Sequence, residues 1–362
     1  MKKLCLSLSL AMLISGVASA ESKEVRVYNW SDYIDESLFK EFEAETGYKV
    51  TYDVFDSNEL LETKMLAGSS GYDVVVPSQT FLQRQIQAGA FQKLDASKIP
   101  NKKNEWDTIK ARIAPFDADN AYSVNYLWGT TGLGVNVDKV KEILGDDAPI
   151  DSLDLVFNPK NMEKLSKCGV YFLDAPTEII PAALAYLGEN PDSHDPDVIA
   201  KTEAVLMGVR PYVKKFDSSE FISSLANGDI CVAIGYSGDV LQSRDRAEEA
   251  DNGITIAYNA ASEGSQMWFD QMAIPADAKN PDGAHAFINF ILDPENSAKI
   301  SNYVNYASGN LAAQEFIDKS VMEDPAIYPD EKTMENLYVT TTYPPKVLRR
   351  VNRLWTKIKS GT

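Results

Sequence analysis

An α/β fold with two lobes, each a doubly wound sheet flanked by helices, is predicted by three features of the sequence. Strand and helix patterns alternate from residue 25 to residue 87, and a second group of strand patterns follows between residues 133 and 236. The chain has 362 residues, which is more than a single hydrophobic core usually holds. Alternating strands and helices are typical of a parallel sheet covered by helices on both faces.

The N-terminal region has the spacing of such a sheet. Leu38 and Phe42 lie on one face of a predicted helix, and Ser57 is placed to cap the next helix. Strands are predicted at 25–30, 49–55 and 73–76, and helices at 35–46, 57–68 and 81–87. Ligands of these folds bind beyond the carboxyl ends of the strands, so the loops at 30–33 and 77–78 are the first candidates for a site.

The remaining chain repeats the pattern and then returns to the first lobe. Strands are predicted at 133–137, 170–173, 230–236 and 267–274, helices near 178–187, 197–208 and 284–292, and a helical tail from Glu331 with a break at Tyr343-Pro344-Pro345. Gly129 to Gly132 are the expected crossover into the second lobe. We therefore expect lobe 1 at 24–130 and 262–316, and lobe 2 at 131–261 and 317–362.

The first twenty residues have the order of a secretory signal peptide. Lys2 and Lys3 precede an apolar run from Leu4 to Leu13, and Ala18-Ser19-Ala20 supplies a small-residue cleavage site. We expect cleavage after Ala20 and a periplasmic protein; the alternative is a buried N-terminal helix. No cysteine follows a Leu-x-Gly pattern at the cut, so lipid attachment is not expected.

Two cysteines, Cys168 and Cys231, remain after Cys5 leaves with the signal peptide. In an oxidising compartment an even pair predicts one disulfide, and two buried free thiols are the alternative.

The net charge of the chain is −18. A strongly acidic surface repels nucleic acid and anionic lipid and attracts small cations, although it also serves solubility. No nucleic-acid partner is expected.

Signatures of enzymes and cofactor sites are missing from the sequence. No G-x-S-x-G, zinc spacing, Walker A loop, strand-linked G-x-G-x-x-G or EF-hand loop occurs. The two histidines, His194 and His285, are expected on the surface. We therefore expect neither a cofactor nor a metal and no enzymatic activity, while a pair of carboxylates acting as a hydrolase stays open.

Acidic residues stand beside aromatic residues at the ends of several predicted strands. The candidates are Asp32 between Trp30 and Tyr33, Asp239 after ICVAIGY, Asp270 beside Trp268, Glu178 at the start of a helix, and Tyr306 in NYASGN. Each has a structural alternative: a helix cap, a charge on a helix dipole or a core aromatic.

Asp270 is the hardest to explain structurally. It lies inside the apolar strand QMWFDQMAIP, where a buried carboxylate is costly unless it is paired. A ligand cation or a distant arginine would pair it. A diamine fits best, because each ammonium group needs carboxylates and the methylene chain needs aromatic walls.

At these residues the chain resembles the periplasmic putrescine/spermidine-binding proteins of polyamine ABC transporters. The resemblance covers essentially the whole mature chain and rests on YNWSDYI (28–34), YDVFDSNE (52–59), YDVVVPS (72–78), GVNVDKV (134–140), ANGDICVAIG (226–235), AIPADAKN (273–280) and WTKIKSG (355–361). It implies a two-lobed type II binding fold that closes on its ligand at a hinge, an inner-membrane ABC permease as partner, and a monomer.

The resemblance also implies which residues bind the polyamine. Trp30, Tyr33, Trp268 and Tyr306 would frame it, Asp239 and Asp270 would hold one ammonium end, Glu178, Asp32, Ser31 and Ser78 would face the other, and Ser218 is a weaker candidate. Tyr236 stands where relatives commonly have tryptophan, which would thin the aromatic wall.

The residues of the predicted site resemble two types of relative that prefer different polyamines. Trp268 resembles the spermidine type, whereas Ser31, Asp32 and Ala175 resemble the putrescine type. The expectation is spermidine slightly ahead of putrescine. Alternatives are a sensor-input polyamine receptor, a carboxylate-based hydrolase, and a carbohydrate or ferric-ion receptor.

Overall fold

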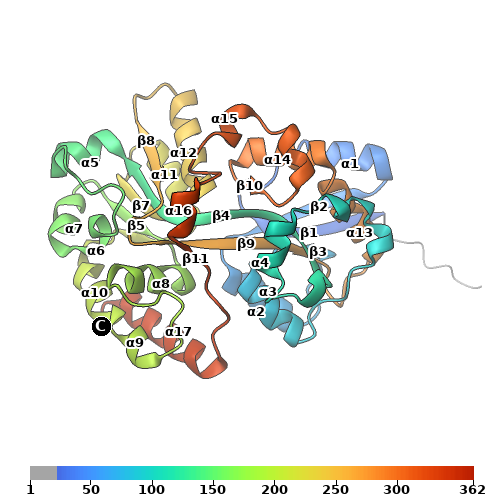
Figure 1. Cartoon of the computed structure of the whole chain (residues 1–362), viewed down its shortest axis with the longest axis horizontal. Coiled ribbons are helices and arrows are strands. Elements are labelled where there is room, and N and C mark those ends of the chain that lie inside the picture. The colour runs from blue at the N-terminus through green and yellow to red at the C-terminus, as the bar shows by residue number, and fades with distance from the viewer. Residues whose placement is uncertain (1–22) are drawn as a thin grey trace, which may run out of the picture.

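A computed structural model describes residues 23–362, in which one mixed sheet runs through both halves of the molecule (Figure 1). The predicted signal peptide and its cleavage site after Ala20 lie outside the described residues. Within residues 23–362, no helix combines the length and the apolar character needed to span a membrane.

The sheet contains eleven strands in the described part of the chain. They are β1 (Glu24–Trp30), β2 (Lys49–Phe55), β3 (Val74–Val75), β4 (Ser123–Asn136), β5 (Val170–Phe172), β6 (Lys215–Phe216), β7 (Val232–Tyr236), β8 (Ile256–Asn259), β9 (Ser265–Ala273), β10 (Ala307–Ser308) and β11 (Leu337–Tyr338). The main path is β2-β1-β3-β9-β4-β7-β5-β6, with β8 and β10 paired to β4, and β11 to β9.

Two long strands, β4 and β9, cross the middle of the molecule and join its halves (Figure 1). The pairs at the two ends of the sheet are parallel, as expected of doubly wound lobes, whereas β4 and β9 pair antiparallel. Every residue of both strands is buried. In this region the sequence predicts a strand only at 133–137, and of these residues 133–136 belong to β4. The structure extends that strand through Gly129–Gly132, so the expected crossover between lobes is a continuous strand.

Helices cover the sheet on both sides (Figure 1). They are α1 (Leu38–Thr46), α2 (Asn58–Leu66), α3 (Gln79–Gln87), α4 (Asp107–Ile113), α5 (Val137–Leu144), α6 (Asp154–Phe157), α7 (Pro159–Leu165), α8 (Pro176–Tyr186), α9 (Pro196–Ala200), α10 (Thr202–Val209), α11 (Phe221–Ala226), α12 (Ser237–Glu249), α13 (Pro281–Ile291), α14 (Pro294–Val304), α15 (Lys319–Met322), α16 (Glu331–Glu335) and α17 (Pro345–Ser360). Short 3-10 helices occupy 96–98, 100–104, 118–120, 210–212 and 311–315.

Local hydrogen bonds explain where the helices depart from the predicted ranges. The amide of Ser37 donates to Asp35 Oδ1 at 2.9 Å, and this turn delays the start of α1 to Leu38. The predicted helix at 197–208 is two helices, α9 and α10. At their junction the hydroxyl of Thr202 donates to the carbonyl of Ile199.

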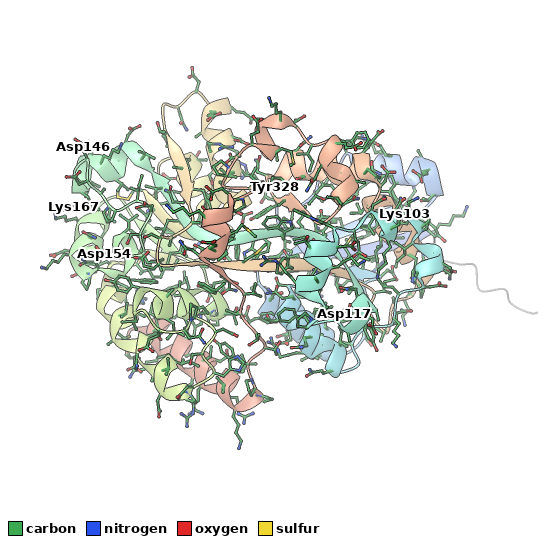
Figure 2. All side chains as sticks on the ribbon, in the orientation of Figure 1. Lys103, Asp117, Asp146, Asp154, Lys167 and Tyr328 are labelled. Carbon is green, nitrogen blue, oxygen red and sulfur yellow. A yellow bond between two sulfur atoms is a disulfide. The ribbon has the colours of Figure 1, made fainter. Side chains whose placement is uncertain are left out.

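Buried apolar side chains form separate cores on the two sides of the molecule. One core is built mainly from 128–269 and 313–358, and two smaller ones from 25–127 and 268–306. These groups resemble the predicted lobes, whose boundaries stay a prediction. Charged side chains such as Asp146 and Lys167 project from the edge of the molecule (Figure 2).

His285 is not on the surface, and that expectation is wrong. Its side chain lies in α13, is buried, and accepts a hydrogen bond from the amide of Asp95 at Nε2 (2.9 Å). Its Nδ1 lies 2.6 Å from the carbonyl oxygen of Pro281. Two satisfied ring nitrogens explain how a histidine is tolerated in this core.

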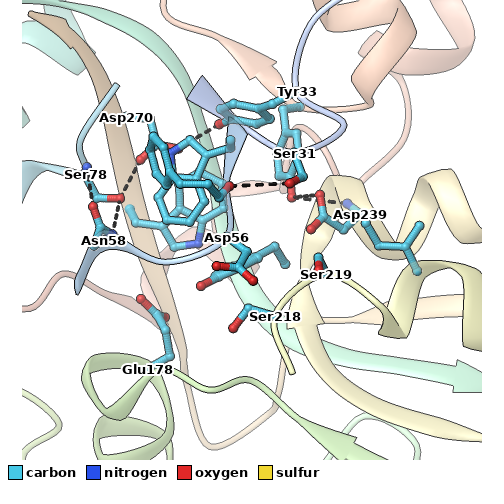
Figure 3. A pocket seen from close by; sticks show the side chains of 16 residues that line it. Ser31, Tyr33, Asp56, Asn58, Ser78, Glu178, Ser218, Ser219, Asp239 and Asp270 are labelled. Atoms are coloured by element: carbon cyan, nitrogen blue, oxygen red, sulfur yellow. Dashed lines mark hydrogen bonds between the residues drawn. The ribbon is translucent and has the colours of Figure 1, made fainter. Parts of the chain in front are cut away.

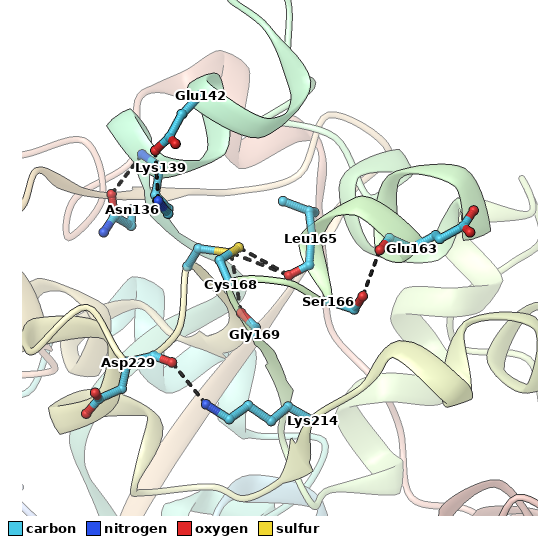
Figure 4. Close-up of a disulfide and its surroundings, with 11 residues drawn as sticks. Asn136, Lys139, Glu142, Glu163, Leu165, Ser166, Cys168, Gly169, Lys214 and Asp229 are labelled. Carbon is cyan, nitrogen blue, oxygen red and sulfur yellow. Dashed lines mark hydrogen bonds and ion pairs between the residues drawn. A yellow bond between two sulfur atoms is a disulfide. The ribbon is translucent and has the colours of Figure 1, made fainter.

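A disulfide joins Cys168 and Cys231, as the sequence predicts (Figure 4). Each cysteine comes just before one of two neighbouring parallel strands, β5 and β7, which brings their Cα atoms to 5.5 Å. The amide of Cys231 also donates to the carbonyl of Gly169 at 3.0 Å. The bridge therefore fastens the starts of two adjacent strands.

Removing this bridge is expected to destabilise the fold. The cysteines are 63 residues apart, and closing a loop of that length restricts the unfolded chain by roughly 4 kcal/mol. The variant Cys168→Ser/Cys231→Ser should lose about 2–4 kcal/mol of unfolding free energy in urea denaturation. Two thiols that react with a labelling reagent in the unreduced, denatured parent protein would contradict the bridge.

Candidate ligand-binding site

One cavity gathers all of the predicted site residues except Asp32 (Figure 3). Its walls come from the end of β1, the start of α3, the starts of α8 and α12, the middle of β9 and the loop before β10. The predicted residues on these walls are Trp30, Ser31, Tyr33, Ser78, Glu178, Ser218, Tyr236, Asp239, Trp268, Asp270 and Tyr306. Their roles in binding stay a proposal.

Asp270 is buried in the centre of β9 and is held by two hydroxyl groups. Tyr33 Oη donates to its Oδ2 at 2.9 Å, and Ser78 Oγ donates to its Oδ1 at 2.5 Å. Burial raises the pKa of Asp270 to about 7, and these two hydrogen bonds oppose the rise. Because its neighbours are hydroxyls rather than cations, the charged form of this carboxyl is poorly stabilised by the protein alone.

Asp239 lies in the first turn of α12 and is also buried. Tyr306 Oη donates to its Oδ1 at 2.7 Å, and the amide of Asp239 donates back to the same Oη at 3.1 Å. Burial raises the pKa of Asp239 to about 7, against the lowering effect of the Tyr306 hydrogen bond. The alternative of a simple helix cap does not explain this pairing with a tyrosine from a distant loop.

Glu178 occupies a third wall, near the start of α8. Thr131 Oγ1 donates to its Oε2 at 2.7 Å, and Gln266 Nε2 donates to its Oε1 at 3.0 Å. The indole nitrogen of Trp268 in turn donates to Thr131 Oγ1 at 3.2 Å. Burial raises the pKa of Glu178 to about 8. The three carboxyl groups lie at separate points around the cavity (Figure 3).

Aromatic side chains form an edge-to-face series along the cavity. Ring centroids are 6.3 Å apart for Trp30 and Tyr236, 5.6 Å for Tyr236 and Trp268, 5.4 Å for Trp268 and Tyr306, and 5.1 Å for Tyr306 and Tyr33. These rings pack on one another as core residues do, and they also line the cavity. Their contact with a ligand stays a prediction.

Asp32 lies outside the cavity lining, contrary to its expected place beside the ligand. Its Oδ1 is 2.6 Å from Arg246 Nη2, and its carbonyl accepts from Gln242 Nε2 at 3.3 Å. The backbone of Asp32 has a φ of 53°, which turns it away from its neighbours Ser31 and Tyr33. Arg246 thus provides the distant cation, but for Asp32 rather than for Asp270.

Several residues of the lining were not predicted from the sequence. They are Phe55, Asp56, Asn58, Ser219 and Ile222. Asn58 donates through Nδ2 to Ser78 Oγ (2.9 Å) and accepts at Oδ1 from the amide of Ser78 (3.0 Å). It therefore orients the hydroxyl that bonds to Asp270. Phe55 ends a predicted strand, and ligands of these folds bind beyond the carboxyl ends of strands. The same reasoning that selected the loop after β1 would therefore have found Asp56 and Asn58.

The arrangement suits a positively charged ligand rather than an anion. Four of the described residues in the lining are acidic, and none is lysine or arginine. Within residues 23–362, no three His, Cys, Asp or Glu side chains are grouped to hold a metal ion.

Comparisons with known proteins identify the family. The family model of the bacterial extracellular solute-binding proteins matches residues 37–329. The chain is 52% identical to the putrescine-binding periplasmic protein SpuD of Pseudomonas aeruginosa, over 99% of this chain and 98% of that protein. It is 49% identical to the putrescine-binding periplasmic protein PotF of Escherichia coli, over 96% and 94% of the two chains.

Solved structures give the same result. A spermidine/putrescine ABC transporter protein of Listeria monocytogenes superimposes with a TM-score of 0.84 at 34% identity, over 93% of this chain and 99% of the other. The fold is that of the type II periplasmic binding proteins, as expected from the sequence. The chain belongs to the bacterial extracellular solute-binding protein family.

Proposed function

We propose that this protein captures a linear polyamine in the cavity and delivers it to an ABC importer of the inner membrane. The observation that carries the proposal is the set of three buried carboxyl groups, on Glu178, Asp239 and Asp270, in an aromatic cavity whose described lining has no basic side chain. Each carboxyl contacts only neutral hydrogen-bond donors among its closest partners. A ligand with two or more ammonium groups supplies the missing positive charge.

The energetics agree with this assignment. A charge-assisted hydrogen bond contributes roughly 1.5–3 kcal/mol, and a desolvated cation–π contact roughly 0.5–2 kcal/mol. Several such contacts, less the costs of ordering the ligand and removing water, leave about 8 kcal/mol, which corresponds to a micromolar Kd. The methylene chain of a polyamine would rest against Trp30, Tyr236 and Trp268.

All lining residues predicted from the sequence are proposed to contact the ligand directly or through water. Asp32 is proposed to act at the edge of the site through its ion pair with Arg246. Sharing of one ammonium group by Asp239 and Asp270, which the resemblance implies, stays a prediction. In the structure each of the two has its own hydrogen-bond partners.

Among polyamines we propose putrescine ahead of spermidine. The relatives at 52% and 49% identity are both named putrescine-binding proteins, whereas the structure named for spermidine and putrescine is 34% identical. The comparisons do not confirm the spermidine preference expected from Trp268.

The same relatives support a periplasmic location and an ABC permease as partner, and we propose both, with a monomeric receptor. SpuD and PotF are named as binding proteins rather than enzymes, so the hydrolase alternative is not favoured. The sensor-input alternative has no specific observation in its favour either.

A calorimetric titration panel tests the function. The protein is titrated at near-physiological salt with putrescine, cadaverine, spermidine and spermine, and with butane-1,4-diol as the uncharged control. Putrescine should bind with a micromolar or lower Kd, the diol should not bind, and bound putrescine should be recovered unchanged. No binding of any polyamine, or recovery of a modified product, would contradict the proposal.

A further inference from the structure

The ring of Tyr306 is packed directly against the backbone of Gly238, the second residue of α12. A Cβ atom placed on Gly238 would lie 2.5 Å from both Cδ2 and Cε2 of that ring, and 2.7 Å from Cγ. Cβ atoms do not approach other atoms so closely, so no larger residue fits while the ring stays in place. Gly238 lies in the segment predicted to belong to lobe 2, and Tyr306 in a segment predicted to belong to lobe 1.

The ring cannot move aside to make room. Its opposite edge faces Gly129 of β4, where a Cβ would lie 2.9 Å from Tyr306 Cδ1. Two further rings pack edge-on against it, Trp268 at 5.4 Å and Tyr33 at 5.1 Å between centroids. Only 2% of Tyr306 is exposed. Added volume at Gly238 must therefore move α12 away from the ring, because close-packed cores do not absorb it.

The position of this ring also fixes a carboxyl group of the site. Tyr306 Oη donates to Asp239 Oδ1 and accepts from the Asp239 amide, at 2.7 and 3.1 Å. Asp239 follows Gly238 directly in α12. A displacement of α12 from the ring would break both hydrogen bonds and turn the carboxyl away from the cavity.

We propose that Gly238 is a positioning residue for ligand binding: its missing side chain forms a socket for Tyr306 that lets the two lobes meet and aims Asp239 at the ligand. This inference deepens the proposed function and rests on it, and Gly238 acts through Tyr306 and Asp239 without contacting the ligand.

The test compares Gly238→Ala with Gly208→Ala. Gly208 also lies in a helix, α10, and a Cβ there would meet only Pro159 Cγ at 3.6 Å, an ordinary contact. Gly238→Ala should bind putrescine about ten- to hundredfold more weakly than the parent protein. This range corresponds to the usual free-energy cost of forcing an extra methyl group into a packed core. It should also have a larger radius of gyration in X-ray scattering, with and without putrescine. Gly208→Ala should match the parent in both measurements.

A double variant separates the socket from a general packing defect. Once Tyr306→Ala has removed the ring, adding Gly238→Ala should cost little further affinity, since nothing is left to collide with. Additive losses would overturn the inference, as would an unchanged affinity or an unchanged radius for Gly238→Ala alone. If Gly238→Ala fails to fold, Tyr306→Ala should restore folding, and failure to restore it also overturns the inference.

The parent protein distinguishes the two proposals. Absence of putrescine binding by the parent contradicts the proposed function, while the scattering of the ligand-free Gly238→Ala variant still tests the socket. Binding by the parent together with normal binding by Gly238→Ala contradicts the socket alone.

Discussion

Asp270→Asn is expected to weaken putrescine binding about hundredfold, and at least tenfold. The substitution keeps the size of the side chain but removes the charge that faces the ligand. Loss of one partner from a buried, hydrogen-bonded charge pair typically costs 2–5 kcal/mol, of which about 2.7 kcal/mol corresponds to a hundredfold change. The measurement is isothermal titration calorimetry at fixed pH and salt.

Asp146→Asn is the matched control for this experiment. It makes the same change of charge at an exposed position on the edge of the molecule (Figure 2). Its effect on affinity should be small, because exposed charges far from the site are screened by salt. If Asp270→Asn and the parent protein bind putrescine with equal affinity, the prediction that the charge of Asp270 contributes to binding is wrong.

Putrescine affinity is expected to fall at least tenfold as the pH is lowered from 8 to 6. In the ligand-free protein burial raises the pKa of Asp239 and of Asp270 to about 7, and the pKa of Glu178 to about 8. A bound ammonium group favours the charged carboxylates, so binding must release the protons that these groups hold. Alkylammonium groups have pKa values near 10, so the ligand stays charged throughout.

The size of the effect follows from proton linkage. Each group that must lose a proton can reduce affinity by up to tenfold per pH unit below its ligand-free pKa. Titrations between pH 5.5 and 8.5, together with calorimetry in two buffers of different ionisation enthalpy at pH 7, measure the affinity and the number of protons released. A constant affinity without proton release would show that these carboxyls are already charged in the free protein.

Stability without ligand should show the opposite trend. The pKa values of the three carboxyls are higher in the folded protein than the values near 4 of the unfolded chain. Their contribution to stability is therefore complete below about pH 4 and is lost as the pH rises towards 7–8. Thermal unfolding should show a ligand-induced rise in Tm that grows from pH 6 to pH 8.

Much of the local structure follows from the sequence because its causes are local. The strand at 49–55 matches β2 residue for residue, and Ser57 caps α2 by accepting a hydrogen bond from the amide of Leu60. The disulfide follows from the compartment and from an even number of cysteines. The prediction of a role for Asp270 follows from one carboxylate in an otherwise apolar strand.

Other features depend on partners that are distant in the chain. The pairing of β11 with β9 and the burial of His285 against Asp95 have no local signal. The site itself spans residues 30 to 306, and the ion-pair partner of Asp32 is Arg246, more than two hundred residues away.

By itself the sequence determined the α/β class, most elements and the residue types that a polycation requires, since periodicity, caps and strand-end acids are properties of short segments. Only the tertiary structure decided that β4 and β9 form one sheet through both halves, that Asp32 pairs with Arg246 outside the cavity lining, and that the ring of Tyr306 packs on Gly238. The physical reason is that charge pairing and close packing act through space, between segments whose meeting depends on the whole fold.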